Sequence, residues 1–397
     1  MRLTEIYVIP ASHLRMVIGR ISRAPRTEGT LAVKNRYQFP GLTITLLLTM
    51  IAAFRPVAAQ ILKADIATHI EIDPIKVTLG NQGSITTMAM NADGNLLLGV
   101  SWIEAPKPVR RPAGRDGTVP PGAGGYGPGS ATLADQYVDR HKYAVKVVSP
   151  QGQLLATWPM TDGLAPKVIH AMDDGTVYVG GHGELAIFDA QGKRKKILHT
   201  DPIVGMKALS SGIAVSDQYV FVAFGMGNSL RATQEIYRFD RNLDNPKRIV
   251  DRQYGCCAHL DLDVRNGELL VAENSRHRVN RFDFDGNLLG RWGKRDRTNI
   301  MGFAACCNPV CFDFGPGEVL YTAESGVGRI KKYSQTGEYL GVVGYVDTTV
   351  FDRGSRLALT SCYIPVEVNR DGSRIYIMDV RAYIIRVLAL KSDRKGG

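Results

Sequence analysis

The 397-residue chain is 44% hydrophobic, contains 42 glycines and carries 49 Lys and Arg against 38 Asp and Glu, giving a formal net charge of +11. This composition provides for a large buried core and excludes an intrinsically disordered protein. Residues 1–59 hold eight basic and two acidic residues, so residues 60–397 carry only +5 of that charge. Because no cluster of basic and aromatic residues stands out, we expect no nucleic-acid binding.

The N-terminal segment has the pattern of a signal peptide. An uncharged run of 13 residues, 42–54, follows a basic stretch, and small residues at Val57 and Ala59 precede a cleavage point before Gln60. We therefore expect residues 1–59 to be a leader with a long basic region and the mature domain to be exported, to the periplasm, the cell envelope or the medium. The alternative is an uncleaved membrane anchor. Because a span needs ~20 apolar residues, we expect no stable transmembrane segment in the mature chain.

Short strands with turn signals between them begin after residue 60. A strand-like run at 70–79, interrupted by Pro74, precedes a first unit of four predicted strands at 85–90, 95–102, 143–148 and 153–158. A Pro- and Gly-rich stretch, 103–142, separates the second of these strands from the third. Such a stretch cannot pack as a regular element, so we expect it to be an insertion in this first unit.

Two further units with the same rhythm follow, from about Lys167 and from about Met206. His170 in the first of these lies in a predicted inner strand, and we expect it to be a core residue whose ring has a hydrogen-bond partner. His182, in a Gly-rich turn of the same unit, is expected to be an exposed loop residue.

Residues 255–344 contain two consecutive copies of a repeat of about 50 residues. Equivalent residues recur at offsets of 50 or 51: Cys256 with Cys306, Glu273 with Glu324, Arg278 with Arg329, Gly286 with Gly337 and Gly293 with Gly344. Each copy alternates short apolar runs with turns, which is typical of four antiparallel strands. This arrangement predicts the blade of a β-propeller.

A sixth unit, from about Cys362, contains only three predicted strands. The N-terminal run around 75–79 is the natural fourth strand, because it would close the ring and leave no open sheet edge. We therefore predict an all-β fold for residues 60–397: a six-bladed β-propeller of four-stranded antiparallel blades, closed by an N-terminal strand.

The runs 271–293 and 322–344 resemble the NHL repeat. In that family an acidic residue ends the second strand and an arginine begins the third, as Glu273 and Arg278, and Glu324 and Arg329, do here. The last blade has Asp379 at the acidic position and Ile384 at the arginine position. We interpret these pairs as turn-fixing ion pairs within a blade, because a partly buried charge needs a partner.

The resemblance implies a propeller architecture and leaves the activity open, since NHL-type propellers bind proteins or RNA, and one distant subgroup, the peptidyl-hydroxyglycine lyases, holds zinc over the channel. This chain lacks the several channel histidines expected of that subgroup.

All six cysteines fall in the last three units, and Cys257, Cys307 and Cys362 stand at nearly equivalent positions at the start of the innermost strands. We expect this region to surround one mouth of the channel. In an exported protein an even cysteine count favours disulfides, here among the full set: Cys256, Cys257, Cys306, Cys307, Cys311 and Cys362. A thiolate site for zinc or copper is the second interpretation, with ligands from Cys257, His259, Cys307, Cys311 and Cys362. Unpaired thiols are the third.

These observations lead to three hypotheses of function. The first is an exported propeller that binds a small-molecule ligand or a protein partner on its channel face. The second is a metal-dependent lyase or hydrolase that uses the cysteine-rich site, and the third is a structural scaffold. The sequence contains no CxxCH haem-attachment motif, no phosphate-binding Walker loop and no G-x-S-x-G nucleophile motif.

Overall fold

The computed structural model describes residues 66–79, 83–104, 141–225, 233–256, 259–304, 307–309, 311–346, 364–380 and 382–391. The predicted leader, most of the Pro- and Gly-rich insertion, and Cys257, Cys306 and Cys362 lie outside these residues. No helix in the described part of the chain is long and apolar enough to cross a membrane.

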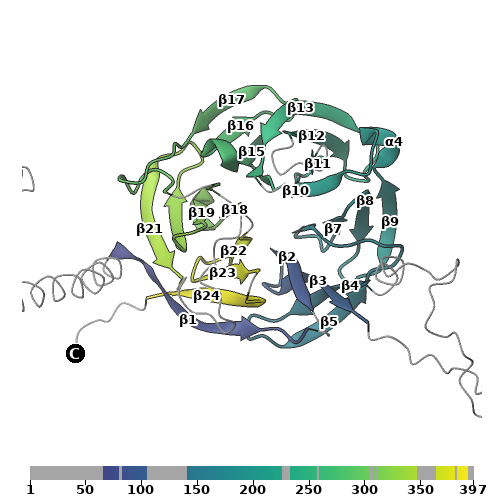
Figure 1. Ribbon diagram of the computed structural model, residues 1–397, viewed down its shortest axis with the longest axis horizontal. Helices are drawn as coiled ribbons and strands as arrows, with labels where there is room; N and C mark the ends of the chain where they lie inside the picture. Colours follow the sequence, from purple (N-terminus) through teal and green to yellow (C-terminus); the bar gives the residue numbers. More distant parts are fainter. Residues whose placement is uncertain are drawn as a thin grey trace, which may run out of the picture. The chain divides into compact units, whose positions relative to one another are not determined.

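Six four-stranded antiparallel sheets are arranged around a central axis (Figure 1), which confirms the predicted fold class. Blade one consists of β2 (Ser84–Met90), β3 (Leu96–Ile103), β4 (His141–Val148) and β5 (Leu154–Pro159). Blade two consists of β6 (Val168–Ala171), β7 (Val177–Gly180), β8 (Glu184–Phe188) and β9 (Arg194–His199). Blade three consists of β10 (Leu209–Val215), β11 (Tyr219–Gly225), β12 (Thr233–Asp240) and β13 (Lys247–Tyr254).

The repeat predicted from the sequence forms the next two blades. Blade four consists of β14 (Asp261–Arg265), β15 (Glu268–Glu273), β16 (Arg278–Phe282) and β17 (Leu288–Trp292). Blade five consists of β18 (Cys311–Phe314), β19 (Leu320–Glu324), β20 (Arg329–Tyr333) and β21 (Tyr339–Tyr345). The only helical elements of the described residues are short: α4 (Asp201–Val204), η2 (Asn274–Arg276) and η3 (Pro316–Glu318).

Blade six is completed by the N-terminal strand, as predicted. Its own strands are β22 (Val366–Val368), β23 (Arg374–Asp379) and β24 (Ile384–Leu390), and β1 (His69–Lys76) pairs antiparallel with β24 as the outer strand. Pro74 falls where the β1 register shifts between Ile72 and Ile75. A proline is tolerated there because β1 is an edge strand that needs no further donors.

The core lies between neighbouring blades rather than inside one of them. Apolar side chains of blades one and six, including Leu98, Val148 and Tyr376, form one buried cluster, and similar clusters fill the other interfaces. Each blade therefore buries both sheet faces, which explains why its inner strands are almost continuously apolar.

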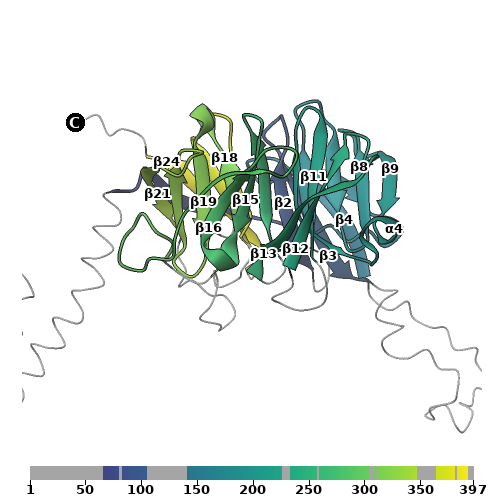
Figure 2. The same cartoon turned by 90° about the horizontal axis from the view of Figure 1, so that it is seen from above.

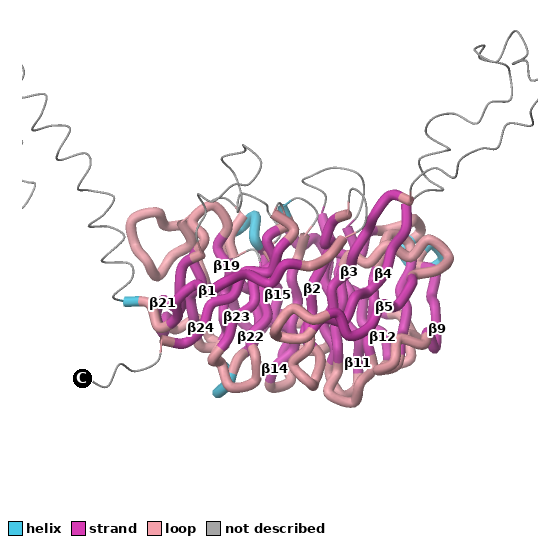
Figure 3. The backbone as a smooth tube through the Cα atoms, turned by 90° about the horizontal axis from the view of Figure 1, so that it is seen from below, coloured by secondary structure: helices cyan, strands magenta, loops and turns pink. Residues whose placement is uncertain are grey.

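The strands run between two faces of the propeller. Figures 2 and 3 show the propeller edge-on from opposite sides, so that both faces are seen in profile. On one face the innermost strand turns into the second, at residues 91–95, 172–176 and 369–374, and we call it the hairpin face. On the other face the fourth strand leads to the next blade, as at Cys256 after β13, and we call it the loop face. His182 lies exposed in a connection on the loop face, as expected.

Candidate functional site

A cavity of about 280 Å³ lies in the central channel and is lined by the innermost strand of every blade, β2, β6, β10, β14, β18 and β22. It reaches the hairpin face at Asn91, Asp173 and Arg370. The sequence analysis predicted binding at the loop face. The cavity instead extends toward the opposite mouth of the channel, at the hairpin face.

One position of the innermost strand recurs in all six blades and forms a ring around the axis. Its members are identified by their cross-strand partners on the second strand, and they are Ala89, His170, Ala214, Asp263, Asp313 and Glu367. Acidic side chains therefore occupy three consecutive blades, four to six. In a six-blade order, the blade that faces blade five across the axis is blade two, which supplies His170.

The acidic side chains link the innermost strands of neighbouring blades. The backbone N–H of Phe312 donates to Asp261 at 2.7 Å, that of Val368 donates to Asp313 at 2.6 Å, and that of Met90 donates to Glu367 at 3.1 Å. An innermost strand has an open edge toward the axis, so its N–H groups need acceptors. These carboxyl groups provide them and connect blades four, five, six and one.

The same carboxyl groups are electrostatically perturbed. Burial raises the pKa of Asp261 to about 7, with the nearby Asp263 charge adding to the effect, and burial raises the pKa of Asp263 to about 6. The pKa values of Asp313 and Glu367 lie well above their usual range, first because of burial and then because of the neighbouring carboxylates. The side chains keep some contact with the cavity, but protein surrounds them, and like charges that close disfavour full ionisation.

His170 lines the cavity instead of packing as a core residue with a partner, so that prediction was wrong. Its ring makes no hydrogen bond within the described part of the chain. Burial, together with the positive charge of Arg241, lowers the pKa of His170 to about 4. At neutral pH its imidazole is uncharged and offers one donor and one acceptor.

Cys311 lies two residues before Asp313 on β18, in the layer of the channel toward the loop face, beside Asp261. It is a free, buried thiol. Burial and the Asp261 charge raise its pKa well above the usual range, so the sulfur is held as a protonated thiol.

The other described cysteines, Cys256 and Cys307, lie on the loop face, after β13 and β17. His259 is half-buried nearby at the start of blade four, where loss of solvent contact and the charge of Lys167 lower its pKa to about 4. Within the described residues no group of three or more His, Cys, Asp or Glu side chains has a geometry that could hold a metal ion. Because Cys257 and Cys362 lie outside those residues, the complete predicted metal set and the predicted disulfides stay untested.

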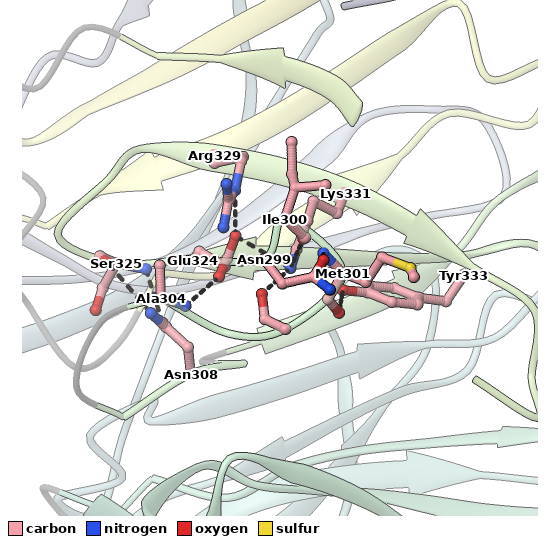
Figure 4. Close-up of polar contacts among 11 residues, drawn as sticks. Asn299, Ile300, Met301, Ala304, Asn308, Glu324, Ser325, Arg329, Lys331 and Tyr333 are labelled. Carbon is pink, nitrogen blue, oxygen red and sulfur yellow. Dashed lines mark hydrogen bonds and ion pairs between the residues drawn. The ribbon is translucent and has the colours of Figure 1, made fainter. Parts of the chain in front are cut away.

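The predicted acid–arginine pairs are present as buried structural contacts. Glu273 pairs with Arg278 across β15 and β16, and Glu324 pairs with Arg329 across β19 and β20 (Figure 4). Glu324 also accepts a hydrogen bond at 3.0 Å from the backbone N–H of Ala304, in the connection from the preceding blade. The pairs therefore fix the loop face and do not line the cavity.

Lys331 is a buried cation that the sequence analysis missed. Its ammonium group donates to the carbonyl oxygens of Ile300 and Gly302 at 3.1 and 2.7 Å and lies 3.4 Å from the Glu324 carboxylate (Figure 4). It also lies 4.6 Å from the centre of the Phe303 ring. Every donor of this ammonium has a partner, so Lys331 holds the 294–304 connection and is not a candidate nucleophile.

Sequence reasoning also missed the channel carboxyl groups, although a signal for two of them was present. Asp263 and Asp313 are 50 residues apart, the same offset that relates the cysteines and glycines of the repeat. Glu367 lies one residue before the last apolar residue of its inner strand, as the two aspartates do. Acidic residues at an inner-strand position of three successive units identify a feature of the channel.

No known family profile matches the chain. A search of curated proteins finds no significant relative. Among solved structures, a catalytically inactive virginiamycin B lyase from Staphylococcus aureus with quinupristin is 11% identical, with a TM-score of 0.44, 81% of this chain covered and 99% of that one. A luciferin-regenerating enzyme is 11% identical, with a TM-score of 0.44 and coverage of 64% and 89%.

A protein of unknown function from Bacteroides caccae is 10% identical, with a TM-score of 0.42 and coverage of 59% of this chain and 78% of the other. These likenesses are too distant to assign a function to this chain.

Proposed function

We propose that this propeller binds a small ligand in its central channel. The observation that carries the proposal is the cavity itself: it is lined by all six innermost strands and combines perturbed polar groups, Asp261, Asp263, Asp313, Glu367 and His170, with a smaller apolar surface. Such a concave site is the usual form of a ligand pocket, and its volume is close to the lower end of the range for them, ~300–1,000 Å³. The ligand is therefore small.

A channel-filling variant tests this proposal. Ala171 lines the cavity next to His170, so Ala171→Trp places an indole in the space that a ligand would occupy. We expect a fragment screen by ligand-observed NMR on the wild-type protein to give hits, and the variant to lose them. His182→Trp is the matched control because His182 is exposed on the loop face. Hits that persist in Ala171→Trp, or a screen without hits, would refute channel binding.

The cysteine-based metal enzyme is the second class of function raised by the sequence. No described observation favours it over ligand binding, and we derive no metal-assisted step. Metal analysis of purified protein together with a thiol count tests this second class. With Cys311 as a free thiol, the other five cysteines can form at most two disulfides, so the disulfide interpretation gives two thiols after denaturation. A thiolate site would give more thiols together with bound zinc or copper.

We also propose that the repeat unit is of NHL type and that the chain is exported after removal of residues 1–59. The support is the acid–arginine pattern of blades four and five and the apolar run at 42–54. N-terminal sequencing of exported protein should give Gln60 or a residue close to it. Recovery of the intact N-terminus in the membrane fraction would favour the anchor instead.

A further inference from the structure

We infer that the channel selects an organic cation, namely a primary ammonium group on a short apolar chain. This inference rests on the proposed function, because it specifies the ligand of the same cavity. Its first support is an uneven distribution of charge. Blades four, five and six contribute four carboxyl groups to the channel, from Asp261, Asp263, Asp313 and Glu367. Blades one to three contribute uncharged groups such as Thr87, Val168 and Ile213, and the one carboxyl group that their described residues add, Asp173 at the mouth, pairs with Arg370.

The acidic wall is only partly compensated by the protein, through the charge of Arg265, which lowers the pKa of Asp263 without offsetting the effect of burial. Across the described residues none of the four carboxyl groups takes part in an ion pair with Lys, Arg or His. Of the two arginines at the hairpin-face mouth, Arg370 pairs with Asp173 at 2.8 Å. The guanidinium of Arg265 lies 4.9 Å from the centre of the Phe314 ring, and its charge also acts on Asp263. A cation entering this space would meet carboxyl groups that form no ion pair, and its charge would favour their ionisation in surroundings that screen charge less than water does.

His170 is an independent indication of a ligand. Protein encloses this side chain, yet its ring has no hydrogen-bond partner among the described residues and lines the same cavity from blade two, across the axis from Asp313. The ring is half-buried and keeps contact with the cavity, so its nitrogen atoms are accessible there. A ligand that reaches across the channel would supply the missing partner.

An ammonium group suits the geometry of the acidic wall because it carries three donors. In each interblade hydrogen bond the backbone N–H uses one carboxylate oxygen: Oδ2 of Asp261, Oδ2 of Asp313 and Oε2 of Glu367. A carboxylate has about four lone-pair sites, so acceptor capacity remains on each group. Among the apolar side chains that line the cavity, the partly exposed Met90 offers surface to a short alkyl chain.

Three probes of nearly equal size test the inference: n-butylammonium, 1-butanol and valerate, each titrated into the soluble protein to ~10 mM and followed by NMR. We expect n-butylammonium to bind with a millimolar dissociation constant and the other two to bind at least ~10-fold more weakly. In Asp313→Asn, whose amide oxygen still accepts from Val368, the affinity for n-butylammonium should fall at least ~10-fold. Glu367→Gln provides the same test should Asp313→Asn fail to fold, and melting curves establish folding.

Asp285→Asn is the matched control, because Asp285 is an exposed carboxylate outside the channel and its loss should leave binding unchanged. Equal binding of the three probes, or of the neutral and anionic ones only, would overturn cation selectivity while leaving channel binding intact. Failure of n-butylammonium to bind a protein that does give Ala171→Trp-sensitive fragment hits would overturn the inference alone. If Asp313→Asn and Glu367→Gln leave the affinity for n-butylammonium unchanged, the cation binds elsewhere, and the inference is overturned as well.

Discussion

The side chain two positions beyond the predicted arginine contacts the buried carboxylate in each of the last three blades. In blade four, Asn280 donates to Glu273 at 2.9 Å. In blade five the equivalent residue is Lys331, 3.4 Å from Glu324, and in blade six it is Arg386, which pairs with Asp379 at 2.9 Å. Blade six therefore lacks the arginine at position 384 and has one at 386 instead. Residues two apart on a strand share a face, so either position reaches the carboxylate.

Lys331 should be among the most sensitive single positions in the fold. Replacing it with methionine keeps the length of the side chain but removes the donors to Ile300 and Gly302 and the charge beside Glu324. We expect Lys331→Met to lower the free energy of unfolding by about 3–5 kcal/mol, as for other broken buried ion pairs. Urea denaturation measures this value. Lys247→Met, at an exposed ion pair with Asp285, is the control and should change stability by less than about 0.5 kcal/mol.

The channel carboxyl groups should make the protein less stable as pH rises above neutrality. Their pKa values are raised in the folded state, to about 7 for Asp261 and about 6 for Asp263, so the folded state binds more protons than the unfolded chain. Their stabilisation is complete below the unfolded pKa of ~4 and is lost as pH rises through the folded values.

His170 acts in the opposite direction. Because its pKa is lowered to about 4, its contribution is complete above ~6.5 and is lost as pH falls toward 4. Between pH ~6.5 and ~7.5 the carboxyl groups contribute the main slope, at most about 1.4 kcal/mol per pH unit for each group, because Lys331, whose pKa burial lowers to about 8, opposes them only toward pH 8. We expect the melting temperature to fall across this interval and Asp261→Asn to flatten the profile. A profile that rises with pH and is the same in both proteins would contradict this assignment.

At the scale of elements, the turn between the third and fourth strands packs against a tryptophan of the preceding blade. Gly192 in blade two lies against Trp158, and Gly337 in blade five lies against Trp292. A Cβ on Gly337 would lie 2.3 Å from the indole, and the φ of this residue is +94°. Glycine is required there both by the close approach and by the backbone conformation.

Two alanine substitutions separate these effects. Gly163 has a similar φ of +79° with nothing within 4 Å of an added Cβ, so Gly163→Ala should cost only the backbone strain of about 1 kcal/mol. Gly337→Ala should cost about 1–3 kcal/mol more because the indole must move. Chemical denaturation of both variants provides the comparison, and equal losses would show that Trp292 yields without cost.

The sequence predicts elements better than it predicts the channel, for a physical reason. Strands and turns are encoded locally, by apolar alternation and glycine-containing turns, and the prediction of six blades and of the closing strand is confirmed. The acidic wall depends on residues from blades four, five and six, and these residues meet only after the six blades have closed into a propeller. Asp263, Asp313 and Glu367 each resemble an ordinary polar residue of a strand when they are considered one at a time. The prediction that His170 packs in the core was wrong for the same reason, because the surroundings of His170 come from other blades.

At the scale of the whole molecule, the propeller depends on the pairing of its two chain ends. The β1 strand pairs with β24 from His69 to Lys76, and Ile75 packs in the buried cluster between blades six and one. Three polar contacts add to this pairing. The ring of His69 donates to the carbonyl oxygen of Gly372 at 2.8 Å, Glu71 pairs with Arg386 at 2.8 Å, and the Lys391 N–H donates to Thr68 at 2.9 Å. Loss of β1 would expose the edge of β24 and leave an interface unfilled.

Deleting residues 70–79 should therefore destabilise all six blades together, whereas deleting residues 105–130 of the Pro- and Gly-rich stretch should change the melting temperature little, because that sequence has few apolar residues to bury. Ile75→Asp is a milder test of the same closure and should cost about 3–5 kcal/mol, since it places a charge in an apolar cluster. Thermal unfolding followed by circular dichroism should show a single transition at lower temperature for both closure variants. Equal losses for the 70–79 and 105–130 deletions would mean that β1 is not what closes the ring.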